Sequence, residues 1–122
     1  MLILSNNPLV AESHSDCCAF VQGLPTDVLY KALDYIAAGE YSLFAHPIAG
    51  NERLLRNPFR TVVLESAETK NGMTAEQQLA YLNRALNKME AIDYSEIPQN
   101  THTDYQTVDY ELFLCTLRSM QR

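Results

Sequence analysis

Short apolar runs alternate with helix-start signals along the first half of the chain, and this alternation limits the folds open to it. Four runs have the length and apolar character of strands, at residues 2–4, 18–21, 41–45 and 59–64. Strands that alternate with helices pack as layers, with the helices on the sheet. The sequence therefore predicts an α/β fold: a small, largely parallel sheet of about four strands flanked by helices.

Local capping signals define where the first helices begin and end. Asn7 followed by Pro8 is typical of an N-cap and a first helical residue. Thr26 is the predicted cap of a second helix, which runs to Ala38. Gly39 suits the left-handed position that follows a helix.

Two consecutive helices are predicted at the C-terminus. Thr74 with Gln77, and Thr103 with Gln106, have the spacing of capping boxes for helices over about 74–92 and 104–120. Each helix carries an apolar line of side chains: Leu79, Leu82, Leu86 and Met89 on the first, and Val108, Leu112, Cys115 and Met120 on the second. The spacing in the first helix predicts antiparallel pairing with the second helix or with another copy of the chain.

Length and charge exclude several classes of protein. With 122 residues, the chain is expected to form a single α/β domain over 1–122. It carries 9 Lys and Arg against 15 Asp and Glu, a net charge of -6, which argues against a nucleic-acid footprint and against binding to anionic membranes. No apolar run approaches the roughly 18–20 residues of a membrane span.

The cysteines and the N-terminus indicate a cytoplasmic protein. Cys17, Cys18 and Cys115 are odd in number and include no Cys-x-x-Cys pair, so we expect reduced thiols rather than a disulfide framework. The nearest approach to a metal cluster is at residues 14–18, where adjacent cysteines on a strand would point to opposite faces, so we expect no metal and no cofactor. The first residues lack the basic region of a signal peptide.

Polar residues follow two of the predicted strands. Asn6 and Asn7 come directly after the first strand, and His46 follows the third. Ligands of open parallel sheets gather beyond the carboxyl ends of the strands, and a helix start offers free backbone N–H groups to an anion. These residues are therefore candidate ligand contacts, although capping and loop hydrogen bonds are the stronger explanation for them.

A basic cluster lies close to the same motif. Arg53, Arg56 and Arg60 fall within eight positions of an otherwise acidic chain. Guanidinium groups bind carboxylate and phosphate through their forked donors, whereas pairing with nearby acids is the ordinary fate of such a cluster. With Gly50 of the intervening loop, the candidate site consists of Asn6, Asn7, His46, Gly50, Arg53, Arg56 and Arg60.

Catalytic motifs are almost absent from the sequence. It contains no G-x-S-x-G, G-x-G-x-x-G, P-loop or H-E-x-x-H. His46 could act as a general acid or base, and Cys17 or Cys18 could pair with His14 or His46 for nucleophilic work. An enzyme that uses His46 is thus one alternative.

Several segments resemble the GrdX family, over roughly the first half of the chain. The likeness lies in Asn6-Asn7-Pro8-Leu9-Val10, Asp27-Val28-Leu29, residues 34–39, His46-Pro47-Ile48-Ala49-Gly50, and Asn57-Pro58-Phe59-Arg60-Thr61. The sequence departs from the family at Arg53-Leu54-Leu55-Arg56, where relatives carry a Lys-Pro-Asn-Glu type of run. The resemblance implies an accessory protein encoded beside glycine, sarcosine and betaine reductase genes, and it implies no particular reaction.

The leading hypothesis is therefore a non-catalytic accessory protein of reductive amino-acid metabolism. At the carboxyl edge of the sheet it would bind a small anion, a carboxylate or phosphate, or an acidic protein partner. A second alternative, beside the His46 enzyme, is an oligomeric interaction protein, such as a homodimer, that uses the helices at 74–92 and 104–120.

Overall fold

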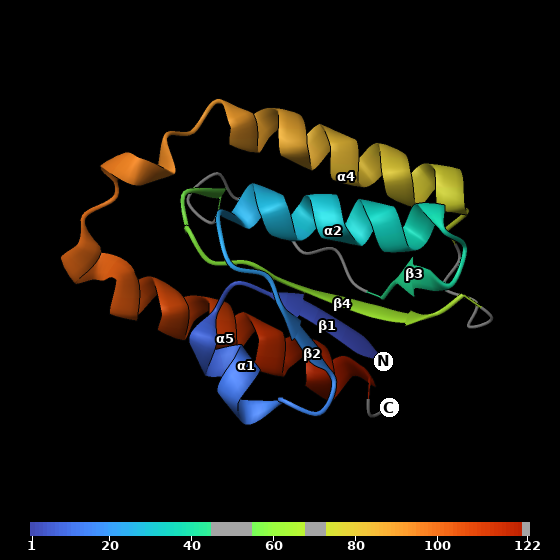
Figure 1. Cartoon of the computed structure of the whole chain (residues 1–122), viewed down its shortest axis with the longest axis horizontal. Coiled ribbons are helices and arrows are strands. Elements are labelled where there is room, and N and C mark those ends of the chain that lie inside the picture. The colour runs from blue at the N-terminus through green and yellow to red at the C-terminus, as the bar shows by residue number, and fades with distance from the viewer. Residues whose placement is uncertain (45–54, 68–72, 121–122) are drawn as a thin grey trace.

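A four-stranded sheet with helices on both faces forms the protein (Figure 1). The computed structural model describes residues 1–44, 55–67 and 73–120. Its strands are β1 (Leu2–Ser5), β2 (Cys18–Phe20), β3 (Tyr41–Leu43) and β4 (Thr61–Ser66). Its helices are α1 (Pro8–Ser13), α2 (Pro25–Ala37), α4 (Ala75–Glu90) and α5 (His102–Met120), with the short 3-10 helices η1 (Tyr94–Glu96) and η2 (Gln99–Thr101) between the last two.

The sheet is mixed, so the expectation of a largely parallel sheet is wrong. Its strand order is β2-β1-β4-β3. β1 and β2 pair in parallel, but β4 lies antiparallel to both β1 and β3. Parallel neighbours need a crossover connection, usually a helix, whereas antiparallel neighbours do not. The alternation of strands and helices in the first half of the sequence favoured the parallel arrangement, but β4 runs opposite to both of its neighbours.

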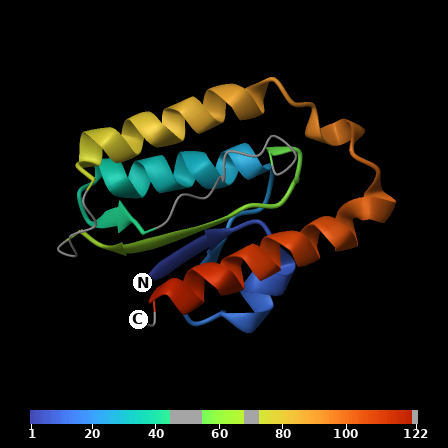
Figure 2. The same cartoon turned by 180° about the vertical axis from the view of Figure 1, so that it is seen from behind.

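The two faces of the sheet are covered by different helices, as Figures 1 and 2 show from opposite sides. α2 and α4 pack together over one face, against Leu4, Val62 and Leu64. α1 and α5 cover the other face, where Phe113 of α5 packs with Ile3 and Val63. The predicted pairing of α4 with α5 is therefore wrong, because η1 and η2 carry the chain around the end of the sheet.

The buried face of α5 differs from the predicted apolar line. Val108 and Leu112 are 43% and 44% exposed, and Cys115 is exposed as well, whereas Asp109 and Phe113 are buried. The Met120 side chain lies outside the described part. The apolar pattern predicted the wrong buried face for α5, because the carboxylate of Asp109 occupies a central buried position on that helix.

Three local predictions about helix ends are confirmed. The Asn7 side chain accepts a hydrogen bond from the backbone N–H of Leu9 at the start of α1. Gly39 follows α2 with φ +84°, the left-handed conformation that glycine adopts without strain. The Thr74–Gln77 capping box is formed by reciprocal hydrogen bonds of 3.1 and 2.9 Å.

Other predicted boundaries are corrected. α2 begins at Pro25, so Thr26 is not its cap; the Asp27 carboxylate instead accepts from the N–H of Leu24 at 2.8 Å. α5 begins at His102, which places Thr103 inside its first turn. β4 begins two residues later than expected, because side-chain oxygens of Asn57 and Asn6 take the N–H groups of residues 59 and 60. None of the helices in the described ranges is long and apolar enough to cross a membrane.

Candidate functional site

Polar residues gather at the end of the sheet where β1 ends and β4 begins. Ser5, the last residue of β1, is paired in register with Thr61, the first residue of β4. Asn6 and Asn7 follow β1, and Arg60 precedes β4, so three predicted site residues meet at one end of the sheet. They meet for a reason that the sequence did not reveal: β4 is antiparallel and contributes its beginning, not its end.

Asn6 joins three segments through a buried amide. Its Nδ2 donates to the carbonyl oxygens of Gly23 and Pro58, at 3.0 and 2.9 Å. Its Oδ1 accepts from the N–H of Arg60 at 2.8 Å. Both amide hydrogens are thus used within the protein, and the side chain holds the segment before β4 against the end of β1.

Asn7 connects α1 to α5 and is fully buried. Its Nδ2 donates to the carbonyl oxygen of Gln106 and to Oδ2 of Asp109, both at 2.9 Å. Its Oδ1 caps α1 by accepting from Leu9 at 3.1 Å. All the hydrogens of this side chain are therefore engaged with the fold.

Asp109 stands at the centre of this buried network, and the sequence analysis missed it. Its Oδ2 accepts from the Thr61 hydroxyl at 2.7 Å as well as from Asn7, and the Ser5 hydroxyl lies 2.8 Å from that of Thr61. Burial raises the pKa of the Asp109 carboxyl, while these hydrogen bonds and the positive charge of Arg60 oppose the rise. A carboxylate four residues before the apolar Phe113 on one helix was the signal available in the sequence.

Arg60 is buried beside the segment that precedes it. Its Nη2 lies 3.5 Å from the carbonyl oxygens of Leu55 and Asn57. Burial lowers the pKa of the guanidinium, whereas the negative charge of Asp109 and a hydrogen bond with Tyr94 act against that lowering. With 3% of its surface exposed, Arg60 organises the segment internally.

Two further contacts secure the same segment, and sequence reasoning found neither. The Tyr94 hydroxyl donates to the carbonyl oxygen of Leu55 at 2.6 Å, and burial raises the pKa of that phenol. The Asn57 side chain donates to the carbonyl oxygen of Tyr105 at 2.9 Å. Residues 55–60 are therefore held at both ends by buried polar groups.

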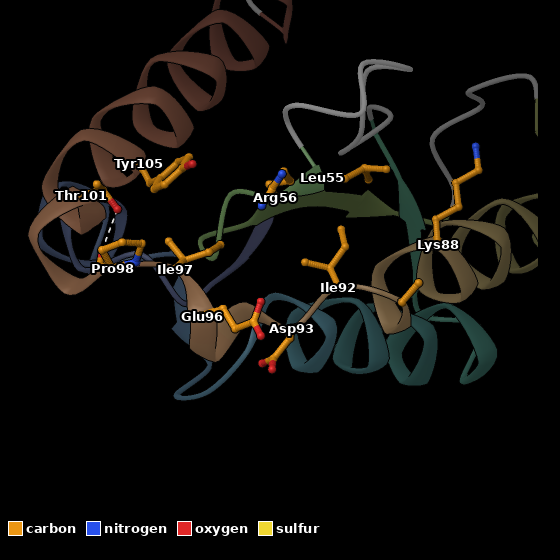
Figure 3. Close-up of a pocket in the computed structure, with 11 residues that line it drawn as sticks. Leu55, Arg56, Lys88, Ile92, Asp93, Glu96, Ile97, Pro98, Thr101 and Tyr105 are labelled. Atoms are coloured by element: carbon orange, nitrogen blue, oxygen red, sulfur yellow. Dashed lines mark hydrogen bonds between the residues drawn. The ribbon is translucent and has the colours of Figure 1, made fainter.

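Arg56 differs from the other described candidates because its side chain is exposed and lines a pocket (Figure 3). The pocket has a volume of about 1040 Å³ and lies between residues 55–56, the end of α4, η1 and the start of α5. Lys88 and Arg56 bring positive charge to it, Asp93 and Glu96 bring negative charge, and apolar surface comes from Leu55, Ala91, Ile92, Ile97 and Pro98. His46, Gly50 and Arg53 lie outside the described residues.

Thiol chemistry receives little support from the geometry. Cys17 and Cys18 are partly buried, Cys115 is exposed, and all three are free. Burial, and then the neighbouring Cys17, raise the pKa of the Cys18 thiol, which disfavours the reactive thiolate. The His14 ring packs edge-on against Phe113, with Nδ1 2.8 Å from the Ser13 hydroxyl. In the described ranges, no group of three or more His, Cys, Asp or Glu side chains could hold a metal ion.

Comparison with known proteins places the chain in a family. The search of curated proteins returned no match, and the search of solved structures returned none. The family model described as GrdX-like protein matches residues 2–118. That range contains all four strands and nearly all of the helical sequence described above, including the C-terminal half of the chain, which the local motifs did not reach. The chain belongs to the GrdX-like protein family.

Proposed function

We propose that this protein is a non-catalytic accessory protein of reductive amino-acid metabolism, of the glycine reductase type, that works in the cytoplasm. The resemblance described above supports the metabolic setting, and family membership supports the accessory role. Its molecular task in this proposal is to bind a small anion, a carboxylate or phosphate, in the pocket beside residues 55–56.

One observation carries the proposal: Arg56 and Lys88 line the same pocket. In the described part of the chain, no ion pair joins either of them to Asp93 or Glu96. A guanidinium binds carboxylate or phosphate through two parallel N–H donors, and an ammonium adds a point charge. Among the described residues, neither cation is therefore neutralised by a carboxylate of the pocket lining.

The buried network gives Arg56 a defined position. The backbone carbonyl of Leu55 accepts from Tyr94, and the side chain of Asn57 donates to the carbonyl of Tyr105 on α5, so both sequence neighbours of Arg56 are anchored. A preorganised contact loses less entropy when a ligand binds. In this proposal Asn6, Asn7 and Arg60 position the site, Arg56 contacts the ligand, and His46, Gly50 and Arg53 remain predicted contacts.

Thermal-shift titration with inorganic phosphate and with succinate tests the proposal. A ligand at a free concentration of about 100 times its Kd raises the free energy of unfolding by about 2.7 kcal/mol. We expect that rise for the native protein and for Arg84→Ala, a matched control whose exposed side chain on α4 does not line the pocket. We expect no rise for Arg56→Ala. The proposal fails if neither anion stabilises the native protein, or if the two variants respond alike.

A second candidate function, an oligomeric interaction protein, is favoured by the outer face of α5. Val108 and Leu112 lie one helical turn apart, and each exposes more than two-fifths of its surface. α4 supports this alternative less, because its buried residues Leu82, Leu86 and Met89 already belong to the core with α2. A homodimer through α5 would show twice the monomer mass by light scattering and would dissociate on Leu112→Lys. The enzyme alternative depends on His46, outside the described residues.

A further inference from the structure

The pocket beside Arg56 contains charged groups of both signs. Its lining contains the cations of Arg56 and Lys88 and also the carboxylates of Asp93 and Glu96. A ligand that carried only negative charge would meet two carboxylates as well as two cations, and the carboxylates would oppose its binding. The lining therefore matches a ligand that presents both a negative and a positive group.

The charges are separated within the pocket. Figure 3 shows the carboxylates of Asp93 and Glu96 on the η1 side, with Arg56 across from them and Lys88 at the far end beyond Ile92. Ile92 and Ile97 contribute apolar surface to the same lining. This distribution favours a ligand with an apolar body between its two charged ends.

Glu96 is the more available of the two carboxylates. Oδ1 of Asp93 accepts from both the N–H and the hydroxyl of Ser95, at 3.0 and 2.5 Å, and so caps η1. Within the described ranges, Glu96 makes no side-chain hydrogen bond or ion pair. A cationic group in the pocket would therefore find Glu96 as its main partner, with Asp93 as a second negative charge.

We propose that the ligand of this pocket is a zwitterion of the amino-acid class, with a carboxylate held by Arg56 and an amine held by Glu96. This inference rests on the anion-binding function proposed above and narrows its ligand class. The positive charge of Lys88 adds to the electrostatic attraction that draws the ligand's carboxylate into the pocket. The apolar residues between the charged groups contact the carbon chain of the ligand.

Calorimetric titration with matched pairs of compounds tests the inference. Each pair consists of an amino acid and the acid that lacks its amine: β-alanine with propionate, γ-aminobutyrate with butyrate, and ε-aminocaproate with caproate. A charge-assisted hydrogen bond to the amine should make at least one amino acid bind about tenfold more tightly than its partner acid. Glu96→Gln should abolish that difference without weakening the binding of the plain acid, because it removes a negative charge that opposes the carboxylate. Glu111→Gln, exposed on α5 and outside the pocket lining, should leave the difference intact.

The results separate the two proposals. If the plain acids bind through Arg56 and no amino acid binds more tightly, or if Glu96→Gln leaves the difference unchanged, the zwitterion inference is overturned and the anion-binding function stands. If the native protein binds none of the compounds and no phosphate, both proposals fail. Both proposals are supported if Arg56→Ala abolishes all binding and if Glu96→Gln removes the preference for the amino acid over its partner acid.

Discussion

Replacing the buried Asn7 with alanine removes three hydrogen bonds with one substitution. The side chain caps α1 through Leu9 and donates to the carbonyl of Gln106 and to the carboxylate of Asp109. Loss of an N-cap costs about 1 kcal/mol. Loss of a neutral hydrogen bond costs about 1 kcal/mol, and loss of one to a charged group about 1.5–3 kcal/mol. We therefore expect Asn7→Ala to lower the free energy of unfolding by about 4 kcal/mol.

This loss is large for a chain of this length. Small domains unfold with free energies of about 5–15 kcal/mol, and a chain of this size loses about 4 °C in Tm per kcal/mol. The expected fall in Tm is therefore about 15 °C by calorimetry, with a matching fall in the urea midpoint. Asn83→Ala is the matched control: Asn83 is exposed on α4, where alanine favours the helix, so its change should stay within about 0.5 kcal/mol.

A third variant separates the cap from the tie to α5. Asn7→Ser keeps a good N-cap oxygen but loses both amide donors, so it should be more stable than Asn7→Ala by about 1 kcal/mol and still far below the native protein. If Asn7→Ala costs less than about 1 kcal/mol, the hydrogen bonds to Gln106 and Asp109 contribute nothing to stability. The account of Asn7 as the link between α1 and α5 would then be refuted.

Three further predictions concern other buried polar groups. Ser5→Ala should lower the free energy of unfolding by about 2 kcal/mol, because the Ser5 hydroxyl accepts from the N–H of Asn7 and contacts the Thr61 hydroxyl. The buried Ser42 hydroxyl has no hydrogen-bond partner in the described ranges, so Ser42→Ala should be nearly neutral. Equal losses of stability for the two variants in urea unfolding would contradict this prediction. The folded state raises the pKa of Asp109 above its ordinary 3.8, so the folded chain binds the proton more tightly than the unfolded chain does. This group therefore makes the free energy of unfolding fall as pH rises from the pKa of the unfolded chain through the raised pKa of the folded one. Asp109→Asn should remove that part of the slope of unfolding free energy against pH, and superimposable slopes would argue against it. Gln78→Ala should speed hydrogen exchange at the amide of Leu43, which donates to the Gln78 side chain at 2.7 Å; an unchanged rate would show that this contact does not protect the edge strand.

The candidate site shows where sequence reasoning succeeds and where it stops. Asn6, Asn7 and Arg60 were expected at the carboxyl edge of the sheet; they lie together at one end of it, but Arg60 precedes β4 and so lies at the amino end of that strand. Their amide and guanidinium groups are buried in contacts with the protein, whereas Arg56 is the described candidate that lines a pocket. A motif identifies which residues matter, but it does not distinguish a side chain that binds a ligand from one that positions the site.

The sequence by itself determined the local structure of this protein. The Asn7 cap, the Thr74–Gln77 box and the turn at Gly39 depend on side chains and backbone only a few residues apart, so residue identity is enough to predict them. The motifs around Asn6 and Arg60 also sufficed to indicate the family.

Only the tertiary structure decided the direction of β4, the separation of α4 from α5 and the burial of Asp109. Asn7 and Asp109 are 102 positions apart, and their hydrogen bond forms only after α5 has packed on the opposite face of the sheet from α4. A buried carboxylate is tolerated where donors and a positive charge surround it, and those partners come from the residue that caps α1, from β4 and from the residue before β4. No local pattern contains that information, because the groups that stabilise the charge meet only in the folded chain.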